Sequence, residues 1–239
     1  MTWSIVAHDP ASDAFSVAVA TCAFAVGASC PFMRAGVGAV STQSMTNRYL
    51  GPAVLDGMAR GLDPASAIEG ALVGDEGRGI RQVHAVGRDG HAAAWTGQNC
   101  VEWCGSVIAP HVSVAGNMLT GEAVVATTLA AWQAGADLAL AERLMAALEA
   151  GEAAGGDRRG RQSAAMRMVT AEDFPDLDLR VDDHPAPLGE LRRLLEIWRL
   201  EVAPGLALRP SRSNPSGFTD LDAIEARWAA LGLDLRFRR

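Results

Sequence analysis

The densest group of chemically capable residues is the run Gly155–Ser163, with the sequence GGDRRGRQS. Guanidinium groups and the backbone N–H groups of a loop are well suited to bind a carboxylate or a phosphate. A solvated charge run is the alternative, but four glycines from Gly151 onward indicate a constrained backbone. We therefore predict that Asp157, Arg158 and Arg161 bind a small-molecule substrate that is anionic.

Two further groups suggest a metal at first sight, Asp182–His184 and the pair Cys100 and Cys104. Only one histidine accompanies the two carboxylates, so a zinc site would need distant partners. Asp183 is better suited to cap the helix that we expect to start at Pro185. The cysteine pair lacks the C-x2-C spacing of metal sites, and we expect the chain's cysteines to be free thiols. We predict neither a metal nor a cofactor.

Composition and charge exclude several classes of function. Every basic residue is Arg, which excludes Schiff-base, lysine general-base and P-loop chemistry. A formal net charge of −7 without a large basic cluster argues against a nucleic-acid partner. His8, Asp9 and Asp13 interrupt the first apolar stretch, so we expect no signal peptide. Residues 14–33 contain polar residues and Pro31, unlike a membrane span. We expect a soluble, cytoplasmic protein with no membrane partner.

These residues require a scaffold of short strands and amphipathic helices. Strand patterns bounded by turn residues cover 4–9, 14–21, 36–43, 80–86, 91–96, 111–115, 162–170 and 177–181. Helical patterns cover 51–60, 63–73, 121–134, 137–150, 185–200 and 220–231. Hairpin-linked strands are antiparallel, and two sheets with helices on the outside would satisfy this order. From Ala203 the composition shifts to Pro, Ser, Arg and Asn. We therefore predict a domain over 1–202 and an appendage over 203–239 with a short helix.

Six segments together resemble one known family, in that family's order. They are Thr2–Pro10, Val17–Thr21, Arg34–Gln43, Gly116–Leu119, Gly151–Ser163 and Arg180–Pro185. The chain is identified over roughly residues 2–201 as similar to the domain of unknown function 1028 family of bacteria and archaea. The resemblance implies an α+β fold, a four-layer αββα sandwich of two mainly antiparallel sheets between helices, like that of N-terminal-nucleophile (Ntn) hydrolases. It implies a fold more firmly than a function.

The implied chemistry begins at residue 2. Ntn hydrolases cleave amides with a Ser, Thr or Cys that begins the mature chain, and its α-amino group is the general base. Thr2 is small enough for Met1 to be removed, and it would then lie at the head of the first strand. The alternative is that Thr2 is an ordinary strand residue.

Other site residues are also expected from this resemblance. Arg34, at the start of the third strand, would provide the positive charge that other members of the class take from Lys. Asn117 follows a glycine at a strand end and would donate to the oxyanion. Thr42 and Gln43 would bind substrate from the neighbouring strand end. For each residue a structural role is the alternative: a surface salt bridge, a turn, or satisfaction of buried backbone.

Two functions remain open at this point. The first is an amidohydrolase that acts on a small amide or acylated amino compound, with Thr2 as its nucleophile. The second is a non-catalytic ligand-binding or scaffold protein that keeps the fold. We also expect the chain to form a homo-oligomer.

Overall fold

The computed structural model describes residues 2–232. They form two compact units, one that ends at Leu191 and one that begins at Arg192. The first unit contains two sheets and the helices that cover them, and it carries every residue that the sequence singles out for chemistry.

The larger sheet of the first unit has six strands in the order β10-β9-β2-β1-β8-β7, all antiparallel to their neighbours. Its strands are β1 (Thr2–Asp9), β2 (Ala14–Thr21), β7 (Gly105–Ala109), β8 (Val112–Asn117), β9 (Ser163–Val169) and β10 (Leu177–Val181). The β1–β2 hairpin turns at Asp13, whose φ is +52°. Asp9 stabilises this turn, because its carboxylate accepts hydrogen bonds from Ala11 N and Ser12 Oγ.

The smaller sheet has four antiparallel strands in the order β3-β4-β5-β6. They are β3 (Pro31–Arg34), β4 (Gly38–Ser44), β5 (Arg81–Gly87) and β6 (Ala92–Thr96). The short strand β3 differs from the prediction, which left residues 31–34 outside any strand. Four residues with Pro at the first position give too short a pattern to detect. Strand β7 is also missing from the predicted set; it has only five residues and begins with a glycine, so its pattern is short as well.

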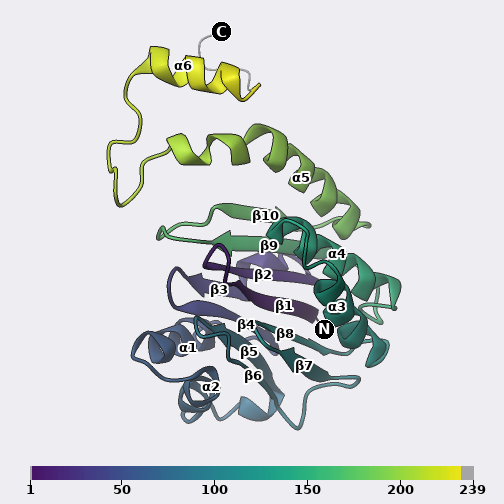
Figure 1. The fold of residues 1–239 in the computed structure, drawn as a ribbon. Helices are drawn as coiled ribbons and strands as arrows, with labels where there is room; N and C mark the ends of the chain where they lie inside the picture. The colour runs from purple at the N-terminus through teal and green to yellow at the C-terminus, as the bar shows by residue number, and fades with distance from the viewer. Residues whose placement is uncertain (1, 233–239) are drawn as a thin grey trace. The chain divides into compact units, whose positions relative to one another are not determined.

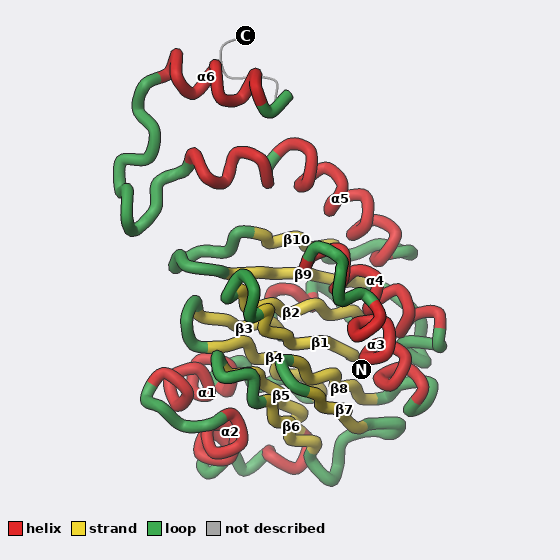
Figure 2. Tube along the Cα trace, viewed as in Figure 1, coloured by secondary structure: helices red, strands yellow, loops and turns green. Residues whose placement is uncertain are grey.

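Helices cover the outer face of each sheet. They are α1 (Leu50–Ala59), α2 (Pro64–Leu72), α3 (Ala123–Ala134) and α4 (Leu140–Ala153). The pair α1 and α2 packs on β4 and β5, and the pair α3 and α4 packs on the larger sheet (Figure 1). Figure 2 shows the strands in yellow between these two pairs of red helices. The predicted fold class, a four-layer αββα arrangement of two antiparallel sheets, is confirmed.

The space between the two sheets has two halves of different character. Near the β1–β2 turn it is apolar and is filled by Val6, Phe15, Val17, Ala39, Val86 and Val169. Near the first residue of β1 it is polar and fully buried, with serine, glutamine and histidine side chains from both sheets. Buried polar groups require hydrogen-bond partners, so this half must form a network.

The second unit contains the end of α5 (Pro187–Glu201), a 3-10 turn (Ala203–Leu208) and α6 (Leu221–Ala230). Asp220 caps α6 by accepting hydrogen bonds from Asp222 N and Ala223 N, and no residue of this helix is buried. The helix predicted over 220–231 is confirmed. Within residues 2–232, the helices are too short or too polar to cross a membrane.

Candidate active site

Two rows of polar side chains face each other at the end of the sheets where β1 begins. The larger sheet contributes one residue from each of four adjacent strands, Asn117, Thr2, Thr21 and Ser163. The smaller sheet contributes one residue from each of three adjacent strands, Gln43, Gln82 and Thr96. We call this part of the molecule the Thr2 end.

Thr2 is held at both its side chain and its backbone. Its hydroxyl donates a hydrogen bond to the Thr21 hydroxyl at 3.2 Å. Its carbonyl oxygen faces the amide nitrogens of Gln43 and Asn117, each at 3.4 Å. Only 7% of Thr2 is exposed to solvent. The structure thus brings together three of the predicted site residues, Thr2, Gln43 and Asn117.

Gln82 joins the two sheets at this end. Its side-chain oxygen accepts hydrogen bonds from Gln43 Nε2 at 2.8 Å and Asn117 Nδ2 at 3.0 Å. Its side-chain nitrogen donates to Gly116 O at 2.8 Å and to Thr96 Oγ1 at 2.9 Å. The amide of Asn117 therefore points into the protein interior, which differs from the predicted role of an oxyanion donor that faces substrate.

A second polar layer lies one step deeper between the sheets. The Ser4 hydroxyl lies 2.7 Å from both Gln43 Oε1 and His84 Nε2, and His84 Nδ1 lies 3.1 Å from the Ser113 hydroxyl. Each of these residues is fully buried. Burial lowers the pKa of His84 from its ordinary value of 6.5 to about 3. His84 is therefore a neutral structural bridge, and its serine neighbours are closed to substrate.

Asp157 connects the glycine-rich loop to the end of β2. Its carboxylate accepts hydrogen bonds from Cys22 N at 2.6 Å and Arg159 N at 2.8 Å, and its side chain is 1% exposed. Both carboxylate oxygens are thus used inside the protein. Asp157 therefore fixes the loop beside the Thr2 end, which differs from its predicted role in binding substrate.

The arginines of this loop have different surroundings. Arg161 pairs with Glu152 at 3.1 Å, and Arg159 pairs with Asp157 at 3.3 Å. Arg158 is exposed, and in residues 2–232 its guanidinium has no ion-pair partner. The loop backbone is constrained as the sequence indicated, since Gly155, Gly156 and Gly160 all have positive φ. Among the residues predicted to bind the anion, Arg158 is the one whose positive charge has no carboxylate partner within residues 2–232.

Two predicted site residues lie away from Thr2. Arg34 pairs with Gly38, at the opposite end of β4 from Gln43, and its guanidinium binds Asp56 of α1 at 2.7 Å. Strand alternation turns Thr42 away from the interlayer space, and its hydroxyl donates to Asn47 O. The structure does not bring these two side chains to Thr2.

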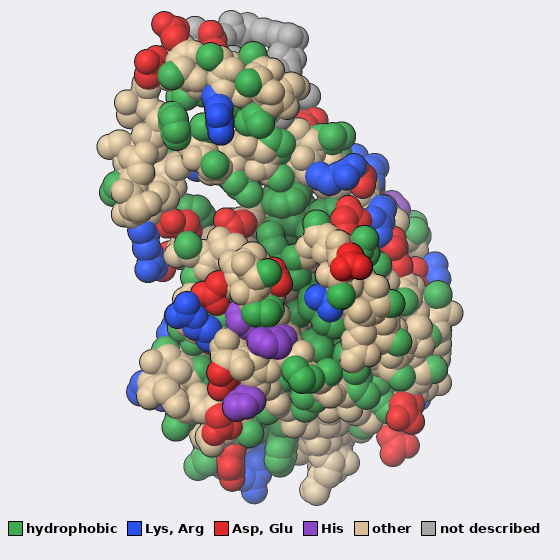
Figure 3. Space-filling view, viewed as in Figure 1, with side chains coloured by type: hydrophobic (Ala, Val, Ile, Leu, Met, Phe, Trp, Pro, Cys, Tyr) green, Lys and Arg blue, Asp and Glu red, His purple; other side chains and the backbone are tan. Residues whose placement is uncertain are grey.

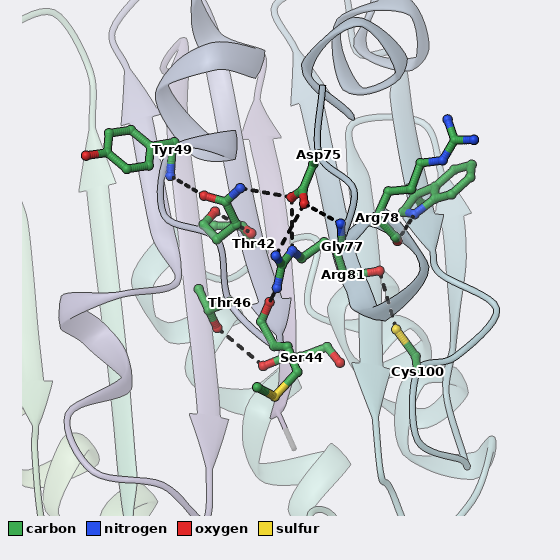
Figure 4. A network of polar contacts seen from close by, with 12 residues as sticks. Thr42, Ser44, Thr46, Tyr49, Asp75, Gly77, Arg78, Arg81 and Cys100 are labelled. Atoms are coloured by element: carbon green, nitrogen blue, oxygen red, sulfur yellow. Dashed lines mark hydrogen bonds and ion pairs between the residues drawn. The ribbon is translucent and has the colours of Figure 1, made fainter. Parts of the chain in front are cut away.

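A polar network fixes the loop that follows β4 (Figure 4). Asp75 accepts hydrogen bonds from Arg81 Nε and Asn47 Nδ2, both at 2.9 Å, and Arg81 also donates to Met45 O at 2.6 Å. These bonds hold the pKa of the Asp75 carboxyl at about 2, with Arg81 as the largest cause. The loop over residues 44–49 is therefore anchored beside the Thr2 end.

Exposed apolar side chains surround the Thr2 end. Phe24, Met45, Tyr49 and Val101 lie on loops that leave this end of the sheets, and Tyr49 is 86% exposed. Met118 N donates to Val101 O at 2.8 Å, which places Val101 next to the residue that follows Asn117. The opposite end of the sheets carries charged and histidine side chains. Side chains of these types gather on the face of the molecule that Figure 3 shows. Exposed apolar groups around a polar floor are typical of a binding site.

The remaining polar motifs have structural roles. The Asp183 carboxylate accepts a hydrogen bond from Gln162 Nε2, and His184 Nδ1 accepts one from Ala186 N, so His184 and not Asp183 binds the backbone before α5. The cysteines are free thiols, as predicted. Within residues 2–232, no three His, Cys, Asp or Glu side chains are grouped to hold a metal.

Four residues of this network, Ser4, Gln82, His84 and Ser113, were not predicted from the sequence. A signal was present, because Gln82 and His84 are polar residues two apart in a strand whose other residues are largely apolar, and Ser41 and Gln43 repeat the pattern. Polar residues at a period of two place a hydrogen-bonding row on one face of a strand.

A family model and a solved structure identify the family of this chain. The model of a "family of unknown function (DUF1028)" matches residues 2–191. The crystal structure of protein SPO2555 from Silicibacter pomeroyi, also of DUF1028, is 32% identical with a TM-score of 0.84, over 92% of this chain and 99% of that one. Anbu (ancestral beta-subunit) from Yersinia bercovieri aligns over 82% of this chain and 96% of its own, with 10% identity and a TM-score of 0.37. No curated protein matches. The chain belongs to the DUF1028 family.

Proposed function

We propose that this protein is an amidohydrolase of the N-terminal-nucleophile type, with Thr2 as its nucleophile once Met1 is removed. The observation that carries the proposal is the placement of Thr2. It is the first residue of a central strand, its hydroxyl contacts Thr21, and two amides fix its backbone at the polar end of the interlayer space. A nucleophile that is also its own base requires this fixed backbone, because the hydroxyl and the amine must keep one geometry.

The reaction proceeds in two steps. The Thr2 oxygen forms a bond to the substrate carbonyl carbon while the α-amino group takes the hydroxyl proton. The C–N bond then breaks, the leaving amine takes that proton, and an ester on Thr2 remains. Water hydrolyses the ester by the reverse proton transfers. Asn117 and Gln43 are positioning residues that hold the Thr2 carbonyl, and Gln82 accepts hydrogen bonds from both of their amides. Arg34 has no part in the reaction.

The substrate that fits this end is a small amide with an apolar acyl part and an anionic group. The exposed side chains of Phe24, Met45, Tyr49 and Val101 would contact the acyl part. Arg158 would pair with the anionic group, because the other two guanidinium groups of its loop already have carboxylate partners.

Intact-mass analysis and turnover of an N-acyl amino acid series test the proposal. The active protein should lack one methionine mass and carry an acyl adduct on Thr2 during turnover. Thr2→Ala should abolish turnover, and Thr2→Ser should retain part of it. Thr127→Ala, a matched change of an exposed threonine on α3, should behave as wild type. Turnover by Thr2→Ala, or by protein that retains Met1, would exclude this mechanism.

The alternative function is a ligand-binding or scaffold protein without catalysis. The positions of Arg34 and Asn117 favour it, because the cation and the oxyanion donor expected for the chemistry do not face Thr2. Binding of N-acyl amino acids without turnover by protein that begins at Thr2 would favour this alternative.

A further inference from the structure

A cavity of about 580 Å³ lies outside the interlayer space, on the helix-covered side of the smaller sheet. It lies between the end of α2 and the last residues of β6. Its walls come from the end of α2, the turn before β5, and the loop after β6. The volume is in the range of small-molecule sites in proteins.

The floor of this cavity is an anchored aromatic ring. The Trp95 indole N–H donates to Arg78 O at 3.1 Å, which fixes the edge of the ring, and 38% of Trp95 remains exposed. Leu72 and Val73 extend the apolar surface, and Val73 is 75% exposed. A fixed, partly exposed indole beside aliphatic side chains is suited to cover the apolar part of a ligand.

The polar wall carries charges of both signs. Glu69, Glu76 and Arg78 line the cavity, and among the described residues none of their charged groups has an ion-pair partner. The carbonyl end of α2 adds partial negative charge on the side of Glu69. Arg78 presents a planar donor that matches a carboxylate. The side chains of Gln98 and Asn99 also line the cavity and have no hydrogen bond within residues 2–232.

We propose that this cavity binds a small zwitterion, a short peptide of about two residues with free amino and carboxyl ends. The carboxylate pairs with Arg78, the ammonium group lies towards Glu76 and Glu69, and an apolar side chain covers Trp95. Gln98 and Asn99 bond the peptide group. Neither a simple anion nor a simple cation would satisfy both signs of charge. This site is separate from Thr2, and its occupation does not depend on the proposed amidohydrolase activity.

Calorimetric titration with the dipeptide Leu-Leu tests the site. The measurement is made on wild type and on Thr2→Ala, so that hydrolysis cannot be mistaken for binding. Loss of either ligand charge, in N-acetyl-Leu-Leu or in Leu-Leu amide, should weaken binding at least tenfold, the usual effect of one charge-assisted hydrogen bond. Methyl β-glucoside serves as a neutral probe that can stack on Trp95 and should not bind.

Two variants test which residue binds each charged end of the ligand. Arg78→Gln should weaken Leu-Leu binding at least tenfold and leave the affinity for Leu-Leu amide unchanged, because the amide has no carboxylate to lose. Glu76→Gln should weaken Leu-Leu binding at least tenfold and leave the affinity for N-acetyl-Leu-Leu unchanged, because that ligand has no ammonium group to lose. Arg60→Gln, a change of an exposed arginine at the end of α1, is the matched control and should bind as wild type.

Trp95→Phe keeps a flat ring without the indole N–H, and should bind more weakly than wild type but retain the preference for both charged ends. Equal affinity of wild type for Leu-Leu and its two blocked forms would overturn the proposal. So would tighter binding of the glucoside, or no heat of binding for Leu-Leu at millimolar concentration.

Discussion

His84 provides a quantitative test of the buried network. The perturbation is His84→Gln, which keeps a side chain able to hydrogen-bond but removes the titratable ring. In the folded protein burial holds the pKa of His84 at about 3, against an ordinary value of 6.5. The unfolded chain therefore binds a proton between these two pH values that the folded chain does not, and wild type loses stability as the pH falls through this window.

The size of this effect follows from the two pKa values. One pKa unit is worth about 1.4 kcal/mol, so the full contribution of His84 is about 5 kcal/mol, lost progressively from pH 6.5 down to pH 3. Between pH 7 and pH 5 the expected loss is about 2 kcal/mol. At pH 7, His84→Gln should itself be destabilised by about 1–3 kcal/mol, because a flexible amide replaces the rigid ring whose two nitrogens bond Ser4 and Ser113.

Urea denaturation at pH 7 and pH 5 measures the difference between the two proteins. The difference in free energy of unfolding between wild type and His84→Gln should shrink by about 2 kcal/mol on going from pH 7 to pH 5, because only wild type has the titrating ring of His84. His91→Gln, a change of a histidine exposed to solvent, is the matched control and should follow the wild-type slope. A gap that stays constant between the two pH values would refute the assignment of His84 as a buried neutral bridge.

Four further predictions test other parts of the structure. Asp157→Ala should lower the free energy of unfolding by roughly 2–3 kcal/mol in urea denaturation, because it removes a buried carboxylate that accepts hydrogen bonds from Cys22 N and Arg159 N. Arg161→Ala should lower it by less than about 1 kcal/mol, because its ion pair is exposed. Arg34→Ala should leave turnover unchanged, since its partner is an exposed carboxylate far from Thr2; reduced kcat would contradict this. A chain that ends at residue 202 should stay folded by circular dichroism, because Gly205 is the only buried residue in 203–232; insolubility would place the domain boundary elsewhere. Light scattering should give a multiple of the chain mass for the predicted homo-oligomer, and a monomer mass would exclude it.

Local patterns were sufficient to predict much of the first unit. The turn residues before Asp13 and the apolar run on each side predicted the β1–β2 hairpin. Asp63 followed by Pro64 predicted the start of α2, and the Asp63 carboxylate does accept hydrogen bonds from Ala65 N and Ser66 N. These features depend on residues close in sequence, where propensity and capping are decisive.

The site was harder to predict because it depends on how two sheets align. Arg34 was expected at the start of the strand beside Thr2, but it ends the short strand β3, and the chain turns at Gly36 with φ of +70° before β4 begins. Gln43, at the other end of β4, is therefore the residue that meets Thr2. Likewise, no pattern within β5 reveals that Gln82 would face Asn117, because that contact joins separate sheets.

The division of the interlayer space also determines which positions are free to vary in sequence. At apolar neighbours such as Val17 and Val86, a smaller side chain at one position and a larger one at the other keep the total volume and cost little stability. Gln43, Gln82 and Asn117 cannot, because a change of one leaves the buried amide of another without its bond. In functional variants of this sequence, these three positions should therefore change together. Residues of the apolar half should be substituted independently of one another.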